Sequence, residues 1–405
     1  MTDTIIVGGG AAGCMAAIQA ARLGKSAVIF ERNGNIGRKL RITGKGRCNV
    51  TNNSTVQEHM ANIPVNPRFL YSAYSGFDAY DTMNFFEELG VPLKTERGNR
   101  VFPVSDNAED IVAALGRELK RLGVKIIGER VTSLILENGC CCGVVAGDTE
   151  YRSNSVLIAC GGKSYPNTGS TGDGYTLAKS AGHTITDLKP GLVPLVSPDK
   201  YCAELMGLSL RNVTLSLYDG QKLLFSELGE MLFTHFGVSG PLVLSASSHL
   251  RKISPDRCRL VIDLKPGLTP EQLDSRLQRD FAENLNRDFS NGIRGLLPAK
   301  MIPVIIALSG IPADKKVNSI TREERHAFGE LIKAFPVRIS KFRPIDEAIV
   351  TSGGVSIKEI SPKTMESKIT PGLFFAGEVI DTDAYTGGFN LQIAFSTAYA
   401  AAQYL

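Results

Sequence analysis

The mostly apolar residues Thr4–Val7 run directly into Gly8-Gly9-Gly10-Ala11-Ala12-Gly13, and this stretch decides the fold. The sequence predicts a strand over Thr4–Val7 and a helix from about Ala11 to Leu23. Gly24 then stands where a glycine commonly ends a helix. A second apolar strand is expected over Ser26–Phe30. The pattern is a complete βαβ unit, which requires two parallel strands in one sheet.

Three glycines with the spacing Gly8-x-Gly10-x-x-Gly13 lie between the first strand and the helix. Gly8 permits the tight turn, Gly10 lets the backbone approach a pyrophosphate, and Gly13 lets the helix pack closely on the strand. The exposed amides at the start of the helix then hold the phosphates. Glu31 ends the second strand, 18 residues beyond Gly13, where its carboxylate can accept hydrogen bonds from an adenosine ribose. The sequence therefore predicts a Rossmann-type dinucleotide site.

Three later segments favour FAD over NAD as the dinucleotide. The loop Gly37–Asn52 carries five basic residues and two asparagines, so it can wrap a pyrophosphate and a ribityl chain. Ala376–Asp381 follows the apolar strand Gly372–Ala376 and offers carboxylates to ribityl hydroxyls. Thr386–Gln392 opens the last helix, and its glycine pair lets helix amides reach the edge of a flavin that is negatively charged when reduced. The alternatives are a solvated basic loop, a surface turn and a simple glycine cap.

Three motifs resemble those of the aminoacetone oxidase/BaiN-like FAD-binding flavoproteins, a family with a glutathione-reductase-like FAD domain. They read Gly44-Lys-Gly-Arg-Cys-Asn-Val-Thr-Asn52, Gly161-Gly-Lys-Ser-Tyr-Pro-Asn-Thr-Gly-Ser-Thr-Gly-Asp-Gly-Tyr175 and Thr386-Gly-Gly-Phe-Asn-Leu-Gln392. The resemblance covers essentially the whole chain. It implies FAD contacts at Gly10, Ala12, Gly13, Glu31, Lys39, Cys48, Asn49, Val131 (to adenine, through its backbone), Asp381, Gly388, Asn390 and Leu391. The candidate cofactor-binding residues also include Gly8, Ala11, Arg32, Thr43, Gly44, Arg47, Gly161, Gly377, Glu378 and Phe389.

Further elements are predicted between the dinucleotide motif and the middle of the chain. Asp106–Leu122 is expected to be a helix, with Asp106 as its N-cap and Glu109 completing a capping box. Val124–Leu136 predicts two strands, and Val156–Cys160 another. The stretch Gly34–Asn53 shows neither helical nor strand periodicity and is predicted to be a functional loop.

The pattern of the chain changes near Pro190. Residues 191–263 alternate as β-strands do. Two capping boxes, Thr269-Pro-Glu-Gln272 and Thr321-Arg-Glu-Glu324, then mark a helical region. The chain ends in an Ala-rich helix expected over about Asn390–Tyr404. We predict an α/β fold in which a Rossmann-type FAD-binding domain, residues 1–190 and 344–405, is interrupted by a β-barrel-like insert, residues 191–268 and 336–343, and a small helical insert, residues 269–335.

Composition and charge exclude several classes of protein. The 405 residues are 43% apolar and 21% charged, which is typical of a globular protein with more than one core. A net charge of +4 argues against a dedicated nucleic-acid surface. No apolar run could span a bilayer and no leader-like segment precedes the first strand, so we expect a cytoplasmic location. The eight cysteines lack Cys-x-x-Cys spacing and the histidines are scattered, so no metal site is expected.

Few residues are candidates for proton transfer. His235, within Gly229–Pro241, could be a proton donor near neutral pH, although it could instead fix the loop. Tyr385 could cover a flavin or protonate a substrate, or only pack. Cys48 has no resolving partner and is expected to act through its backbone. Gly169-x-x-Gly172-x-Gly174 has the wrong order for a second dinucleotide motif, so either NAD(P)H docks transiently or an organic substrate supplies the electrons.

The sequence thus indicates an FAD-dependent oxidoreductase that acts on a small organic substrate, with NAD(P)H as a candidate electron donor. Two alternatives remain open. One is a flavin-dependent RNA-modifying enzyme, for which Ser275–Arg294 supplies basic residues, although acidic residues are interspersed with them. The other is a flavin-binding sensor with little turnover.

Overall fold

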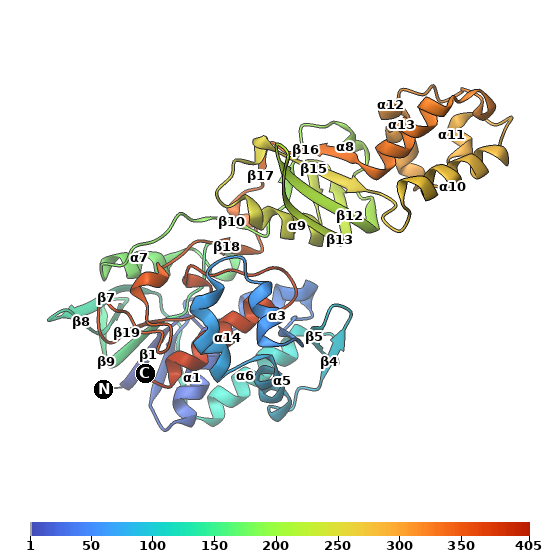
Figure 1. The fold of residues 1–405 in the computed structure, drawn as a ribbon. Coiled ribbons are helices and arrows are strands. Elements are labelled where there is room, and N and C mark those ends of the chain that lie inside the picture. The colour runs from blue at the N-terminus through green and yellow to red at the C-terminus, as the bar shows by residue number, and fades with distance from the viewer. Residues whose placement is uncertain (1) are drawn as a thin grey trace. The chain divides into compact units, whose positions relative to one another are not determined.

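The structure, a computed structural model, describes residues 2–405 and divides into two compact units (Figure 1). Unit 1 contains the residues up to Gly191 together with Pro344–Leu405, and unit 2 is the inserted segment Leu192–Arg343. Each unit has its own hydrophobic core. The finer domain boundaries predicted from the sequence stay predictions.

The centre of unit 1 is a parallel sheet built around the first strand. Strand β1 (Thr2–Val7) lies between β2 (Ala27–Phe30) and β9 (Thr149–Ile158), and both neighbours are parallel to it. β6 (Lys125–Ile127) extends the sheet beyond β2, and β19 (Leu373–Phe375) pairs with β9, again in parallel. The predicted Rossmann-type sheet is therefore confirmed, and the strand near the C-terminus joins the sheet that the N-terminus begins.

Strand β9 belongs to two kinds of pairing. Its polar first half pairs antiparallel with β8 (Cys140–Ala146), which in turn pairs with β7 (Val131–Glu137). Its apolar second half, Val156–Ile158, is fully buried between β1 and β19. The change from polar to apolar residues follows from this change of surroundings, because the first half stands in a partly exposed hairpin and the second lies in the core.

Three helices pack around the sheet, namely α1 (Ala11–Arg22), α6 (Ala108–Arg121) and α14 (Phe389–Ala402), and α1 contacts both others. Small side chains let α14 be buried on nearly every side. The predicted N-cap Asp106 of α6 is wrong. Asn107 is the cap, and its Oδ1 accepts from the amide of Glu109 at 3.0 Å, while Asp106 forms ion pairs with Arg47 and Lys94.

Shorter elements complete unit 1. The stretch predicted as a loop contains a short helix α2 (Arg38–Ile42), a 3-10 turn η1 (Thr43–Gly46) and a strand. The prediction missed them because each is shorter than the window in which a period can be recognised. The remaining elements are β3 (Thr51–Asn52), β4 (Leu93–Glu96), β5 (Arg100–Pro103), α3 (Val56–Ala61), α4 (Tyr71–Gly76), α5 (Ala79–Glu88), α7 (Asp173–Ser180), β10 (Lys189–Gly191) and β18 (Val350–Ser352).

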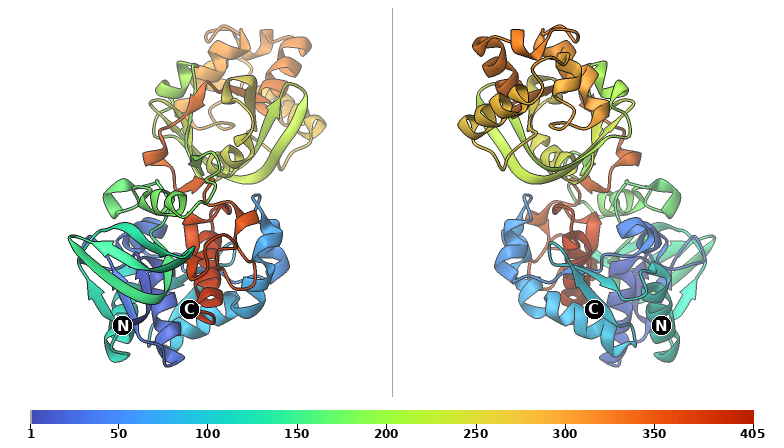
Figure 2. Two further views of the ribbon diagram at one scale, coloured as in Figure 1. Left: turned by 90° about the vertical axis from the view of Figure 1, so that its left-hand side faces the viewer. Right: turned by 90° about the vertical axis from the view of Figure 1, so that its right-hand side faces the viewer.

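Unit 2 is built on a curved antiparallel sheet (Figure 2). Alternate residues of its long strands, such as Val213, Leu215 and Leu217, are buried, as the alternating sequence predicted. The strand order is β16 (Phe335–Arg338), β15 (Cys258–Asp263), β12 (Ser209–Asp219), β13 (Lys222–Thr234), β14 (Gly237–Ser239), β11 (Leu195–Val196) and β17 (Lys341–Phe342).

Helices of unit 2 share one core with this sheet. Thr269 caps α10 and Thr321 caps α13 through the two predicted capping boxes, which are confirmed. The helices are α8 (Tyr201–Glu204), α9 (Pro241–Ser247), α10 (Pro270–Ala282), α11 (Phe289–Gly292), α12 (Ile302–Ser309) and α13 (Arg322–Lys333).

Candidate functional site

The turn between β1 and α1 needs glycine at two positions for steric reasons. A Cβ on Gly13 would lie 1.8 Å from the carbonyl oxygen of Gly8, and a Cβ on Gly8 would lie 2.7 Å from the Cα of Cys160. A Cβ on Gly10, by contrast, would have no described atom within 4 Å. Gly10 is the N-cap of α1, and within residues 2–405 no side chain caps this helix end. Open space thus lies over a positive helix end, an arrangement suited to phosphate.

Glu31 is fixed beside this turn. Its Oε2 accepts from the backbone N–H of Gly9 at 2.9 Å. Its Oε1 accepts from the backbone N–H and from the side-chain Nδ2 of Asn33, both at 2.9 Å. A carboxylate held from both sides at the end of a strand is a preorganised acceptor for a ribose diol.

A second polar cluster is formed by side chains and backbone groups from four separate segments of the chain. Its members are Lys39, Ser164, Thr351 and Glu378. The Nζ of Lys39 donates at 2.7 Å to both the Oγ of Ser164 and the Oε2 of Glu378. The Oε1 of Glu378 accepts from the backbone N–H of Thr351 at 2.8 Å and from the Oγ of Ser164 at 3.0 Å. The sequence predicted Lys39 and Glu378 as site residues. Ser164 was recognised only as part of the motif Gly161–Tyr175, and Thr351 was not predicted, because no local pattern relates these positions.

The loop that precedes β3 exposes its backbone through left-handed residues. Gly44, Lys45 and Cys48 all have positive φ, between 57° and 61°. The Cys48 side chain is fully buried, which raises the pKa of its thiol to about 12. A thiol in that state is a poor nucleophile. The Oδ1 of the next residue, Asn49, is buried and has no hydrogen-bond partner in the described chain.

The start of α14 is held against this loop. A Cβ on the N-cap Gly388 would lie 2.3 Å from the carbonyl oxygen of Thr51, so only glycine fits there. The Nδ2 of Asn52 donates to the carbonyl of Gly387 at 3.0 Å. Within residues 2–405, no side chain caps α14 either.

Gln392 anchors the same junction from inside α14. Its Oε1 accepts from the Oγ1 of Thr51 at 2.6 Å and from that of Thr82 at 2.8 Å. Its Nε2 donates to the Oγ of Ser396 at 3.0 Å. Gln392 was included in the sequence-based prediction only as part of the motif Thr386–Gln392. A polar amide side chain within an otherwise mostly apolar helix is the pattern that could have indicated its role.

The first turn of α1 and the second turn of α14 lie near each other. A Cβ on Gly377 would lie 3.0 Å from the Cβ of Ala12 and 3.6 Å from that of Ala394. The segment that carries Glu378 therefore passes between the two helices. The two open helix ends, the turn of the glycine motif and the polar cluster of Lys39 and Glu378 thus belong to one region of unit 1.

Family membership follows from the sequence as a whole. The sequence model described as "HI0933-like protein Rossmann domain" matches residues 2–404. The chain belongs to the HI0933-like family. A 3-dehydro-bile acid delta(4,6)-reductase of Clostridium scindens is 33% identical to this HI0933-like protein over 405 residues, which are 98% of this chain and 97% of the relative.

Two relatives carry another name. Ribosomal RNA dihydrouridine synthases of Haemophilus influenzae and Escherichia coli are 32% and 30% identical to this HI0933-like protein. The matches cover 99% of this chain, and 98% and 97% of the relatives. Among solved structures, the fold is similar to 3-ketosteroid delta1-dehydrogenase from Sterolibacterium denitrificans, with a TM-score of 0.54 at 15% identity over 99% of this chain and 98% of that one.

The residues of this HI0933-like protein fit FAD. The open space over Gly10 is a cradle that a side chain would fill, and the buried Oδ1 of Asn49 is an acceptor that a ligand donor would satisfy. The protein is an FAD-dependent oxidoreductase. Among residues 2–405 no group of three or more His, Cys, Asp or Glu side chains is arranged to hold a metal. None of the helices described combines the length and the apolar character needed to cross a membrane.

The individual predicted contacts stay predictions, and the structure gives each a place. Asn390 fixes the preceding loop, since its side chain donates to the carbonyls of Ala384 and Tyr385 and accepts from the amide of Ala384. His235 lies in unit 2, in the turn from β13 to β14, while Tyr385 lies in unit 1. The other predicted contacts lie in unit 1 at the start of α1 (Ala11), in the loop (Thr43, Arg47), at the start of β7 (Val131), after β9 (Gly161), before α14 (Asp381) and in its first turn (Phe389, Leu391).

Proposed function

We propose that this protein uses FAD to reduce a carbon–carbon double bond conjugated with a carbonyl group. The observation that carries the proposal is that unit 1 holds two open helix ends, those of α1 and α14, and the carboxylates of Glu31 and Glu378 in one region, where they could accept from ribose and ribityl hydroxyls. The names of the relatives support the type of reaction. A delta(4,6)-reductase acting on a 3-dehydro-bile acid and a synthase of dihydrouridine both add two hydrogens across a double bond near a carbonyl.

FAD, when bound, supplies a two-electron hydride carrier. The residues of this chain would do the rest. Glu31 would bind the adenosine ribose, and the amides that open α1 would bind the pyrophosphate. The amides that open α14 would stabilise negative charge on the reduced ring, because a helix N-terminus carries a partial positive charge. Lys39 would add a second positive charge, held in place by Glu378.

The proton that completes the reduction needs a donor. Tyr385 is our candidate within unit 1, because Asn390 fixes its backbone carbonyl and so its place in the loop before α14. His235 is the candidate from unit 2. We also propose NAD(P)H as the electron donor. The segment Gly169–Gly174 cannot hold it as a Rossmann turn, because it follows a 3-10 turn and not a strand.

Anaerobic flavin chemistry tests the proposal. The purified protein should be yellow, and NADH or NADPH should bleach the flavin band. Addition of a 3-keto steroid with conjugated double bonds, or of another conjugated enone, should restore the band and yield the saturated product. Protein that takes up no FAD would refute the proposal. Reduction by dithionite alone, with no reoxidation by any enone, would favour a sensor with little turnover.

RNA is the second candidate substrate, favoured by the names of two relatives that match over nearly their whole length. The structure offers only moderate electrostatic support, because Arg276 is paired with Asp280 and Arg325 with Asp274. Transcripts of ribosomal RNA prepared without modifications are the probe. Uridine reduction, with binding that weakens steeply as salt is raised, would support this candidate. Absence of binding at low salt would remove it.

A further inference from the structure

The motif Gly161–Tyr175 contributes Ser164 to the polar cluster of the site, and the conformation of the rest of the motif is also closely determined. After β9 the chain passes through η3 (Pro166–Thr168) and turns into α7 at two glycines. Gly169 has a φ of 111° and Gly172 of 86°, a region that favours glycine. A Cβ on Gly169 would lie 2.5 Å from the Nδ2 of Asn33. This segment, residues 165–173, therefore folds back onto the residues that follow β2.

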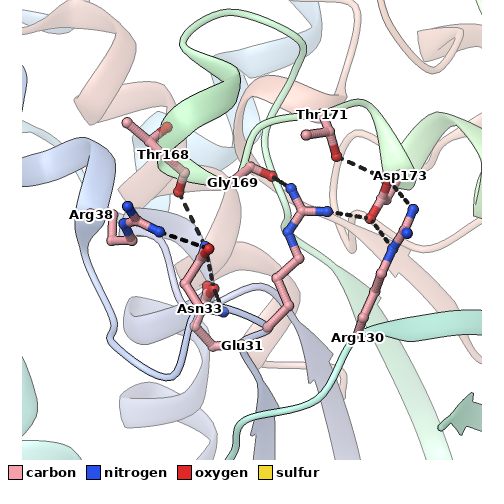
Figure 3. A network of polar contacts seen from close by, with 9 residues as sticks. Glu31, Asn33, Arg38, Arg130, Thr168, Gly169, Thr171 and Asp173 are labelled. Carbon is pink, nitrogen blue, oxygen red and sulfur yellow. Dashed lines mark hydrogen bonds and ion pairs between the residues drawn. The ribbon is translucent and has the colours of Figure 1, made fainter.

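Asp173, the first residue of α7, is the centre of the contacts that hold the segment (Figure 3). Its Oδ2 accepts from the Nη1 of Arg32 at 3.0 Å and from the Nε of Arg130 at 2.9 Å. Its Oδ1 accepts from the Nη2 of Arg130 at 2.9 Å and from the Oγ1 of Thr171 at 3.0 Å. Four donors thus occupy the carboxylate, two of them on one arginine in a bidentate pair.

Two hydrogen bonds, one from Arg32 and one from Asn33, join the segment to the residues that follow β2. The Nη2 of Arg32 donates to the carbonyl of Gly169 at 2.7 Å. The Nδ2 of Asn33 donates to the carbonyl of Thr168 at 3.3 Å and to the Oε1 of Glu31 at 2.9 Å. Figure 3 shows Asn33 between Thr168 and Glu31. Both hydrogen bonds therefore come from residues that directly follow Glu31, where the adenosine ribose is expected.

The Asp173–Arg32 contact is less exposed to solvent than the Asp173–Arg130 pair. The side chains of Asp173 and Arg32 are 22% and 25% exposed, whereas that of Arg130 is 60% exposed. Burial alone would raise the pKa of Asp173, but hydrogen bonds from Arg130 and Thr171 and the positive charge of both arginines hold it below its usual value. The carboxylate is thus ionised near neutral pH and keeps Arg32 in one place.

We propose that Asp173 is a positioning residue for the adenosine half of FAD. Asp173 holds Arg32 and the 165–173 segment in place beside Glu31. The proposal rests on the proposed FAD site. A guanidinium and a segment that are already in place lose little freedom when a ligand binds, so affinity for the adenosine half is gained. Because the flavin end of FAD is recognised by other residues, the effect is expected to depend on adenosine alone.

Substitution of Asp173 by Asn tests this with two ligands. The amide removes the charge and turns an N–H₂ group toward one of the arginine donors. The Kd for FAD, measured by quenching of flavin fluorescence, should rise at least about tenfold. The Kd for ADP, measured by displacement of FAD, should rise by the same factor. The melting temperature of the apoprotein should change little, because partly exposed ion pairs contribute little to stability.

Two further variants calibrate the result. Arg130→Gln leaves Asp173 and Arg32 paired, and a rise in the Kd for FAD of about threefold or less is expected. Glu137→Gln breaks a bidentate pair with Arg152 on the exposed hairpin and should leave both Kd values unchanged. If Asp173→Asn does not fold, Arg32→Lys takes its place. It keeps the charge but not the fork that reaches both Asp173 and Gly169, and the same tenfold loss is expected.

The outcomes separate this proposal from the assignment of FAD. Wild-type protein that binds neither FAD nor ADP would remove the proposed function itself. Wild-type binding of FAD with unchanged affinity in the Asp173→Asn variant would overturn the positioning role alone. A loss of FAD affinity without a loss of ADP affinity would also overturn it, since the effect would then arise outside the adenosine half.

Discussion

The Nζ of Lys39 donates to the Oε2 of Glu378 at 2.7 Å and so joins residues that are 339 positions apart in the chain. The two side chains are 24% and 20% exposed, so the pair is only partly screened by water. The contact ties the loop after β2 to the segment between β19 and α14, the two parts of unit 1 expected to enclose a flavin. Its partners Ser164 and Thr351 leave Glu378 with donors from three directions.

Loss of the Lys39 ammonium should weaken FAD binding. The Lys39→Met variant keeps most of the side-chain volume but removes a charge that Glu378 and the cofactor would share. We expect the Kd for FAD to rise about tenfold, the loss of one charge-assisted hydrogen bond. Lys45→Met is the matched control, because Lys45 is an exposed lysine of the same loop. Equal effects of both variants would mean that only the net charge of the loop matters.

Gly10 and Gly13 should respond in opposite ways to the same methyl group. Gly10→Ala meets open space and keeps an allowed φ of −84°, so the apoprotein should lose less than about 1 kcal/mol. Its methyl group would stand where the pyrophosphate is expected, and FAD binding should fall at least about a hundredfold, roughly 3 kcal/mol. Gly13→Ala would press on the carbonyl of Gly8 and should destabilise the fold by about 3 kcal/mol or more. Thermal melts of the apoproteins and FAD titrations measure both. A Gly10→Ala variant that binds FAD normally would contradict the placement of the phosphates.

Gln392 should be needed for the junction between α14 and the loop. Gln392→Leu removes the acceptor of Thr51 and Thr82 and the donor to Ser396. The hydroxyls of Thr82 and Ser396 keep backbone acceptors, whereas the buried hydroxyl of Thr51 loses the acceptor that Gln392 provides. The expected loss of unfolding free energy is about 1–3 kcal/mol, the cost of one unsatisfied buried group. Gln403→Leu, just beyond α14 and exposed, is the control and should change stability by less than about 0.5 kcal/mol. Urea denaturation of the apoproteins compares them. A loss no larger in Gln392→Leu than in the control would contradict the anchoring role.

The sequence predicted best those parts of the fold whose cause is local. The βαβ unit is determined by a glycine spacing and two short apolar runs, and the capping boxes at Thr269 and Thr321 lie within four consecutive residues. Thr351 could not be predicted, because its partner Glu378 lies 27 positions away and another partner, the backbone N–H of Ser164, lies on the far side of the insert in the sequence. The local sequence does not distinguish Asp106 from Asn107 as the cap, because both residue types are good N-caps. In the structure Asp106 forms ion pairs with Arg47 and Lys94 and Asn107 caps the helix, and these ion pairs are tertiary contacts.

The protein should become less stable as the pH decreases, because of His59. This side chain is 1% exposed, its Nε2 is 2.8 Å from the carbonyl oxygen of Asn52, and burial lowers its pKa below 6.5. The unfolded chain therefore takes up a proton more readily than the folded protein. The stabilising contribution is complete above pH 6.5 and is lost as the pH falls from there through the folded-state pKa, with a slope of up to about 1.4 kcal/mol per pH unit.

His59→Gln keeps a donor to Asn52 but cannot titrate, so its unfolding free energy should depend less on pH between about 7 and 5. His326→Gln, at an exposed position of α13, should retain the wild-type slope. Equal slopes in the wild type and the His59→Gln variant would show that His59 is not the group responsible.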